Sequence, residues 1–150
     1  TNAHMTELQA AVGVALWETF QERIKQRTRL FNAYYRGLPL TYLGIWDKSD
    51  RPNLYKVVAA VPDNWDMAGL AEFLASRKIQ LGSKVYDKPA YRIPALAPEY
   101  NGVTLPKTES FCAGHFCLPM HNALSTDDAE RVAQAITDFH NSSMSSTRKD

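Results

Sequence analysis

A long helical pattern at the start of the chain limits most strongly how this sequence can fold. Thr6 and Gln9 form a capping-box pattern, in which each side chain bonds the other residue's backbone N–H. After it, apolar side chains recur at helical spacing, namely Leu8, Val12, Leu16, Phe20, Ile24, Phe31 and Tyr35. Gly37 followed by Pro39 predicts the end of the pattern. We therefore expect one helix over about 5–37 with an apolar stripe along it.

The length of this helix sets a second constraint. A helix of about 30 residues spans about 45 Å at 1.5 Å per residue. That is longer than a single domain of 150 residues comfortably covers. We expect the helix either to bend or to pack in part on something outside this chain.

Composition narrows the class of protein. The 150 residues are 45% hydrophobic and carry a formal net charge of +1, which fits one soluble globular domain. The weak net charge argues against nucleic acid or anionic lipid as a partner. The sequence has no apolar run near the roughly 20 residues that cross a bilayer. With two cysteines and no secretory signal pattern, we expect a reducing, cytoplasmic setting.

The remainder of the chain alternates strand-like and helix-like segments, which predicts a layered α/β or α+β domain over residues 1–140. A helix over roughly 66–78 is expected to start from Asp63 or Asn64, and Ser125 is expected to cap the last helix. The other expected segments are strands at 40–46, 54–61 and 79–83, an irregular stretch at 84–110, a helix end and strand within 111–120, a helix at 126–140 and a disordered tail at 141–150.

Two groups of residues suggest chemistry, and each also has a structural explanation. Cys112, His115 and Cys117 lie within six residues, but a structural zinc site needs four ligands, so we favour buried cysteines and expect no metal. His115 and His121 could serve as an acid and a base near Cys117, although structural or surface roles fit them better. The sequence has no glycine-rich phosphate loop.

The irregular stretch carries the second group, in which tyrosines alternate with cations. Its members are Tyr86, Tyr91 and Tyr100 among Lys84, Lys88 and Arg92. Such a set could bind a nucleotide or a sugar, and packing within a loop explains it equally well.

Five stretches, taken in order, resemble the sugar aminotransferases of the DegT/DnrJ/EryC1/StrS family. The first, NAHMTELQAAVGVA, is similar to the family pattern N-x-R-M-[ST]-E-L-Q-A-A-x-G-x-A. The others are ERIKQRTRLFNAYYRGL, NLYKVVAAV, DMAGLAEFLASRKIQLGSKVYDKPAY and FCAGHFCLPMHNALSTDDAERVAQAI. The resemblance covers nearly the whole chain apart from its serine-rich end.

The resemblance implies the aspartate-aminotransferase fold (fold type I) and pyridoxal phosphate as cofactor. It covers only the family's C-terminal part, which is the linking helix and the small domain. The family's Schiff-base lysine lies in the large domain upstream of this part, and none of the chain's lysines fits its motif, Lys84 included. We therefore expect no catalytic residue in this chain, no activity for the chain alone, and a start within a longer protein or a separately encoded half.

The same resemblance suggests contacts with the cofactor. Asn2 matches the family's asparagine that completes the phosphate clamp across the dimer interface. His4 stands where the family has arginine. A histidine is mostly neutral near pH 7 and lacks the planar fork of a guanidinium, so either the clamp is weaker or the site does not bind the cofactor in the usual manner.

The resemblance also points to the substrate. Many members place a histidine before the "PAY" segment, in a loop that approaches the sugar bound to the neighbouring subunit. Here the sequence reads SKVYDKPAY, without that histidine. Lys84, Tyr86 and Tyr91 are the resulting candidates for substrate contact.

The expected activity is transfer of an amino group, typically from glutamate, to a keto sugar carried by a nucleotide, in a homodimer or in a pairing with the large domain. A non-catalytic assembly module and a related sugar dehydratase are the alternatives. The sequence leaves open the sugar, the nucleotide and the pathway, which could make cell-envelope polysaccharide or a secondary metabolite.

Overall fold

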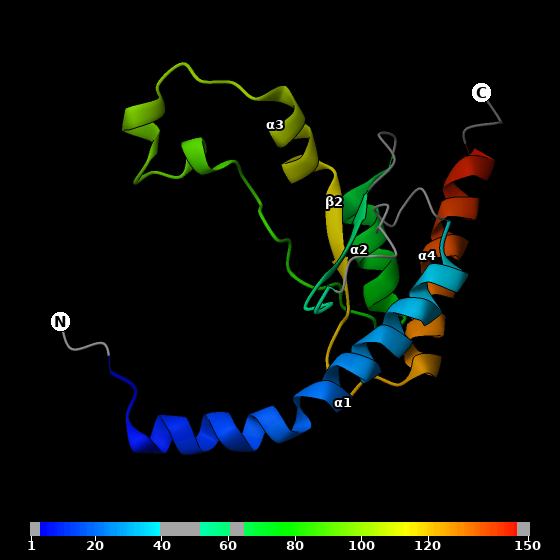
Figure 1. Cartoon of the computed structure of the whole chain (residues 1–150). Helices are drawn as coiled ribbons and strands as arrows, with labels where there is room; N and C mark the ends of the chain where they lie inside the picture. The colour runs from blue at the N-terminus through cyan, green and yellow to red at the C-terminus, as the bar shows by residue number, and fades with distance from the viewer. Residues whose placement is uncertain (1–3, 40–51, 61–64, 147–150) are drawn as a thin grey trace.

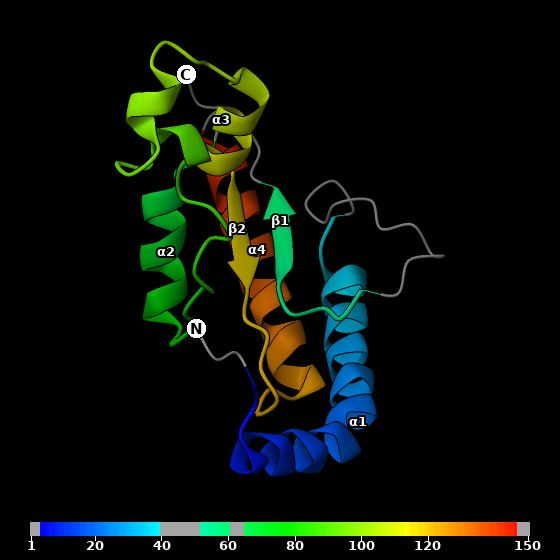
Figure 2. The same cartoon turned by 60° about the vertical axis from the view of Figure 1, so that its left-hand side comes forward.

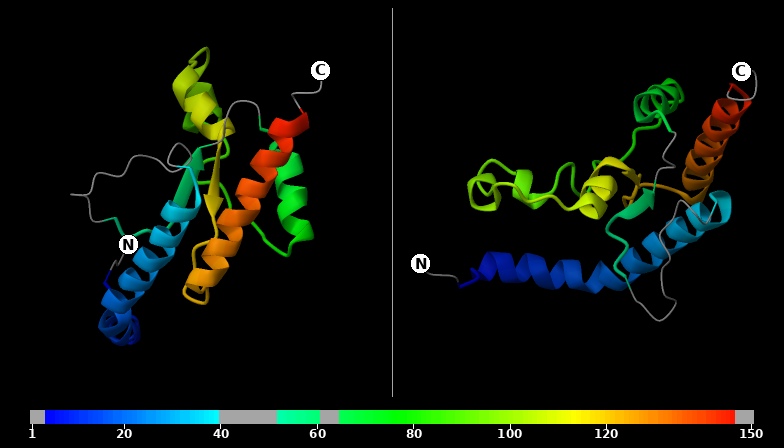
Figure 3. Two further views of the ribbon diagram at one scale, coloured as in Figure 1. Left: turned by 90° about the vertical axis from the view of Figure 1, so that its right-hand side faces the viewer. Right: turned by 90° about the horizontal axis from the view of Figure 1, so that it is seen from above.

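Three helices packed on a two-stranded sheet form the body of the protein. The computed structural model describes residues 4–39, 52–60 and 65–146. Helix α4 lies across one face of the sheet, between α1 and α2 (Figures 2 and 3). The elements are α1 (Glu7–Gly37), β1 (Val57–Ala60), α2 (Met67–Ser76), the 3-10 turns η1 (Ala90–Arg92) and η2 (Ala97–Tyr100), α3 (Pro106–Ala113), β2 (His115–Leu118) and α4 (Thr126–Ser146). This two-layer arrangement confirms the predicted fold class.

Helix α1 begins as predicted but is buried along only half of its length. The Thr6 hydroxyl accepts from the Gln9 N–H at 3.3 Å, and the Gln9 side chain accepts from the Thr6 N–H at 2.9 Å. In the second half, Leu30 and Tyr34 are buried in the core. In the first half, Leu8 is 76% exposed. Figure 1 shows that the helix changes direction about midway and that its first half projects away from the other elements.

The sheet is short, and its strand β2 is fully buried. Strands β1 and β2 pair antiparallel, with Val57 opposite Leu118 and Ala60 opposite His115. All four residues of β2 are buried. The strand predicted at 79–83 is wrong, because this segment meets β2 only through the Gly82 N–H, which donates to the Cys117 carbonyl at 2.9 Å.

The core lies between the sheet and the helices. Ser125 caps α4 as predicted, since its hydroxyl accepts from the Asp128 N–H at 3.1 Å. The Tyr34 hydroxyl donates to the Pro119 carbonyl at 2.8 Å, and burial raises the pKa of this phenol well above its ordinary value. The buried apolar side chains of α2, β1, β2 and α4 include Leu70, Leu74, Val57, Ala59, Phe116, Leu118, Ala129, Val132, Ala133 and Ile136.

Several predicted boundaries differ from the structure. Helix α2 ends at Ser76 and is capped by the Asp66 carboxylate, which accepts from the Ala68 N–H at 3.0 Å. Strand β1 starts only at Val57, because Leu54 has a φ of 50°, outside the strand region. The expected strand at 40–46 and the expected caps Asp63 and Asn64 lie outside the described residues.

Two helices extend beyond their predicted bounds. The expected helix end within 111–120 is the end of α3, which begins at Pro106, inside the stretch expected to be irregular; its sequence PKTESFCA carries no apolar stripe, since only Cys112 is buried. Helix α4 continues to Ser146, so residues 141–146 are helical where we expected a disordered tail. There the Ser143 hydroxyl donates to the Phe139 carbonyl at 2.7 Å, which lets a serine follow the helix. Within the described part of the chain, no helix has the length and hydropathy of a membrane span.

The contact between α1 and α4 leads to a prediction about glycine. A Cβ atom added to Gly37 would lie 2.7 Å from the Ala133 Cβ, so Gly37→Ala should lower the free energy of unfolding by about 1–3 kcal/mol. Gly13→Ala is the matched control, because no atom lies within 4 Å of its added Cβ and alanine favours helix by up to about 1 kcal/mol. Thermal unfolding followed by circular dichroism measures both. Equal stability of the two variants would contradict this packing.

Candidate functional site

The three candidate substrate residues lie on one extended segment, residues 84–113, which we call the arm. The arm leaves the body beside β2, passes through η1 and η2, and returns through α3 (Figure 1). Seen from above, the arm and the first half of α1 project toward the same side of the molecule (Figure 3). The arm therefore reaches out from the body, as expected for a segment that contacts something else.

Lys84 ties the start of the arm to the end of α3, and Lys56 holds the residue just before the arm. The Lys84 ammonium donates to the carbonyls of Cys112 at 2.9 Å and Ala113 at 3.0 Å, at the negative end of the α3 dipole. The Lys56 ammonium donates to the Ser83 carbonyl at 2.9 Å. In this structure Lys84 thus joins the two ends of the arm instead of offering its charge outward.

His115 joins the same two ends from inside the protein. Its imidazole is 0% exposed and stacks on the Phe111 ring, with centroids 4.5 Å apart. Nε2 accepts from the Val85 N–H at 3.2 Å, and Nδ1 meets the Phe111 carbonyl. Since one partner is a donor and the other an acceptor, the ring is neutral with its proton on Nδ1.

A second set of contacts closes the arm further out. The Tyr91 hydroxyl donates to the Glu109 carboxylate and accepts from the Leu105 N–H at 3.2 Å. The Arg92 guanidinium lies 2.7 Å from the same carboxylate. The Tyr91 hydroxyl, followed by the Arg92 charge, holds the pKa of Glu109 below its ordinary value. The Tyr91 hydroxyl is therefore hydrogen-bonded to other residues of the arm.

Tyr86 differs from the other two candidates. It follows Val85 directly and is 62% exposed, so its ring stands on the surface between the two sets of contacts. An exposed tyrosine offers a flat apolar face and a hydroxyl, which suits a sugar or a nucleobase. Of the three candidates, Tyr86 is the one whose side chain is exposed, whereas Lys84 and Tyr91 are partly buried.

One candidate cofactor residue, His4, lies at the other projecting end. His4 is exposed, just before the Thr6 cap of α1. Asn2 lies outside the described residues. His4 is far from the arm in sequence, but the first half of α1 and the arm extend toward the same side of the molecule (Figure 1).

The cysteines and histidines of the 111–121 segment have different environments. Cys112 and Cys117 are buried free thiols, as predicted. Burial raises the pKa of the Cys117 thiol, although the Lys56 charge and the Val85 N–H act in the opposite direction. Because of the raised pKa, this thiol is a poor nucleophile near neutral pH. His121 is exposed. The described residues form no cluster of three metal-ligating side chains.

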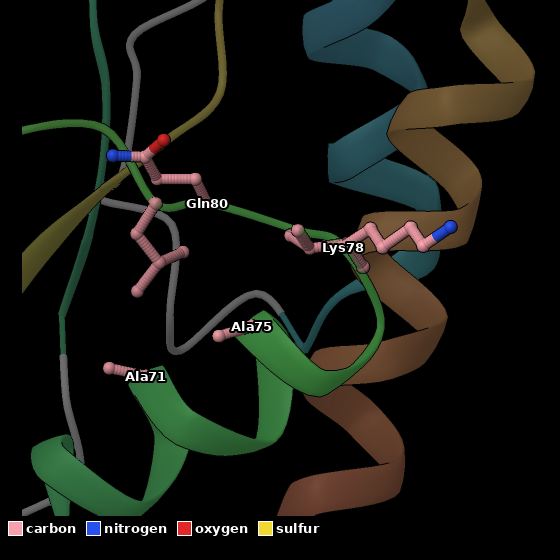
Figure 4. Close-up of a pocket in the computed structure, with 6 residues that line it drawn as sticks. Ala71, Ala75, Lys78 and Gln80 are labelled. Carbon is pink, nitrogen blue, oxygen red and sulfur yellow. The ribbon is translucent and has the colours of Figure 1, made fainter.

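Two open cavities lie away from the arm, on the side of α2 and α4. The first, of about 610 Å³, lies between α2 and the segment that follows it, and Figure 4 shows Lys78 extending away from Ala71 and Ala75. The second, of about 540 Å³, reaches His121, Asp128 and Arg131, but the Asp128 carboxylate is already bonded by the Ser125 hydroxyl at 2.7 Å.

Sequence reasoning missed Lys56 and Glu109, which hold the arm. Lys56 lies 27 residues before Ser83, and Glu109 lies 18 residues after Tyr91. No local motif connects residues at these separations. Lys56 meets Ser83 because Val57 and Gly82 both pair with β2, and Glu109 meets Tyr91 because the chain returns through α3.

The Tyr91 contact leads to a prediction about Glu109. Tyr91→Phe should raise the pKa of Glu109 toward the ordinary value for glutamate, because the hydroxyl that stabilises the carboxylate is removed. In the parent chain the cross-link is complete above the ordinary glutamate range and is lost as the pH falls through the lowered pKa. Carbon-13 NMR titration of the Glu109 carboxyl measures the shift, with Tyr100→Phe as the control on the same arm. An unchanged pKa in Tyr91→Phe would show that the hydroxyl does not hold this carboxylate.

Comparison with solved structures places the fold among sugar aminotransferases. The chain matches DesV from S. venezuelae, solved with a ketimine intermediate, with 25% identity and a TM-score of 0.80 over 93% of this chain and 38% of that chain. It matches DesI, solved in the presence of its TDP-sugar product, with 22% identity and a TM-score of 0.76 over 100% of this chain and 40% of that chain. Helicobacter pylori PseC, an aminotransferase of pseudoaminic acid biosynthesis, matches with 18% identity and a TM-score of 0.71 over 95% of this chain and 39% of that chain.

These matches confirm the expected fold, a part of the fold type I aminotransferases, and the chain spans about two fifths of the length of the solved proteins. A search of curated proteins finds no match. The model of the DegT/DnrJ/EryC1/StrS aminotransferase family matches residues 1–137. The chain therefore belongs to the DegT/DnrJ/EryC1/StrS aminotransferase family.

Proposed function

We propose that these residues are the linking helix and small domain of a pyridoxal-phosphate-dependent enzyme that transfers an amino group, from glutamate, to a nucleotide-linked keto sugar. The family match over residues 1–137 carries this proposal. The structural match to DesV at 25% identity supports it. The TDP-sugar product of DesI and the pseudoaminic acid pathway of PseC favour a nucleotide sugar as substrate. Two buried free thiols fit the reducing cytoplasm.

The described residues do not by themselves fit a complete cofactor site. Pyridoxal phosphate supplies an electron sink, and the protein must add an imine-forming lysine and donors for the phosphate. Here the ammonium groups of Lys56 and Lys84 bind backbone carbonyls. We therefore assign this chain only a contribution to the phosphate contact, from Asn2 and His4 at the start of the linking helix, and no catalytic lysine.

The substrate contact falls to Tyr86 within this proposal. Its exposed ring stands on an arm that is fixed by Lys84 on one side and by Tyr91 on the other. These two residues then act by holding the arm, which revises the simpler expectation that all three touch the sugar. The nucleotide, the sugar and the choice between amino transfer and dehydration rest on residues outside this set.

The partner surface is the exposed apolar face of the first half of α1. Leu8, Val12, Leu16, Trp17 and Phe20 are each between 38% and 76% exposed. Apolar residues gathered along one segment in this way mark an interaction site more often than a free surface. We propose that the large domain and the second subunit of a homodimer cover this face.

The missing lysine leads to a direct prediction. The chain mixed with pyridoxal phosphate and treated with borohydride should show no stoichiometric adduct at any single lysine, because no lysine in the sequence matches the family's Schiff-base motif. Absorbance spectra and peptide mass mapping measure this, with bovine serum albumin as a control for scattered surface labelling. A stoichiometric adduct at one lysine would overturn the assignment of the catalytic lysine to another part of the enzyme.

The exposed helix face leads to a second prediction. The isolated chain should self-associate, and Leu16→Glu should shift it toward monomer, because a charge in an apolar contact costs several kcal/mol. Gln21→Glu adds the same charge at another exposed α1 position and should leave association unchanged. Sedimentation equilibrium measures both. A monomeric parent chain would instead favour a self-sufficient module, the alternative function for this family member.

A further inference from the structure

We propose that His115 and Lys84 are positioning residues that lock the two ends of the arm together and thereby fix where Tyr86 stands. The importance of Tyr86 rests on the proposed function, but the lock itself is a property of this chain. Neither residue is placed to touch a cofactor, because His115 is fully buried and Lys84 binds the end of α3.

The first step of the argument is that both residues bridge the outgoing and the returning backbone. His115 takes the Val85 N–H with one ring nitrogen and meets the Phe111 carbonyl with the other. Lys84 lies on the outgoing side and binds the carbonyls of Cys112 and Ala113 on the returning side. Two side chains, those of His115 and Lys84, therefore connect the same two backbone segments independently of each other.

The second step is that the lock depends on hydrogen bonds more than on apolar packing. The apolar side chains of the arm are largely at the surface, and they include Ile93, Leu96, Tyr100, Val103 and Leu105, each at least 38% exposed. A segment with few buried apolar contacts opens at low free-energy cost unless polar contacts hold it. The ends of the arm are where such polar contacts gather.

The third step links the lock to Tyr86. The Val85 amide that donates to His115 belongs to the residue just before Tyr86, so fixing this amide fixes the backbone from which the Tyr86 ring projects. The Lys56 ammonium holds the preceding turn through the Ser83 carbonyl at 2.9 Å. Tyr86 is exposed and yet stands on backbone held on its N-terminal side by three side chains.

The first test reads the tautomer of His115 in the 150-residue chain near neutral pH. Nitrogen-15 NMR should show a neutral ring protonated on Nδ1, since Val85 can only donate and the Phe111 carbonyl can only accept. His121 serves as the exposed reference within the same spectrum. A ring protonated on Nε2, or a ring averaging between tautomers as His121 should, would overturn the role of His115.

The second test loosens the lock from its outer side, where no core residue is altered. Lys84→Met should speed amide hydrogen exchange at Val85 and Tyr86 about fivefold or more, because charge-assisted hydrogen bonds are lost, and Lys84→Arg should restore part of the protection. Lys107→Met removes the same charge near the other end of α3 and should leave these amides unchanged. Unchanged exchange in Lys84→Met would overturn the lock.

The third test asks whether the lock matters for substrate. In the complete aminotransferase, Lys84→Met should raise the KM for the keto sugar about fivefold or more with kcat within about twofold, since it displaces a binding group and not a reacting one. Faster exchange without a change in KM would overturn the link to substrate. A complete enzyme that transfers no amino group would refute the proposed function instead, and the tautomer and exchange results would still decide the lock.

Discussion

The packing of the second half of α1 against α4 is the contact on which the rest of the structure depends. Leu30 and Tyr34 are buried there, and Gly37 lies so close to Ala133 that no Cβ fits between them. This contact fixes α4 across the sheet and, through the Tyr34 hydroxyl, fixes the segment that follows β2. The first half of the same helix has no such support within the described residues, since Leu8 and Trp17 are exposed by 76% and 70%. One continuous helix thus serves the body at one end and, in our account, another part of the enzyme at the other.

The body and the arm are held by different forces. Burial of apolar side chains stabilises the body, where each buried leucine contributes roughly 1.5–3 kcal/mol. The arm instead relies on lysine, histidine and glutamate side chains that bond backbone or one another, as in the contacts of Lys84, His115 and Glu109. Polar contacts are directional, so they hold an exposed segment in one place where packing against a core is lacking. That arrangement suits the proposed role of the arm, in which Tyr86 contacts the substrate.

The features that could be predicted from the sequence are those that depend on residues close together in the chain. The capping box of Thr6 and Gln9 and the cap at Ser125 were confirmed, because they rest on contacts between near neighbours in sequence. The family resemblance identified the fold correctly. The roles of Lys84 and Tyr91 were not foreseen, because their partners lie 28 and 18 residues away and become neighbours only when α3 returns the chain to the body. The start of α3 at Pro106 was missed because its sequence carries no apolar period, and Asn2 lies outside the described residues.

Hydrogen exchange along α1 tests most directly the claim that this helix belongs to two bodies. In the chain alone, amides of residues 8–20 should exchange as in an isolated helix, while those near Leu30 and Tyr34 should be protected by the full stability of the core. In the complete enzyme the first half should become protected as well. Equally strong protection of both halves in the chain alone would show that the helix needs no partner, and it would contradict the account.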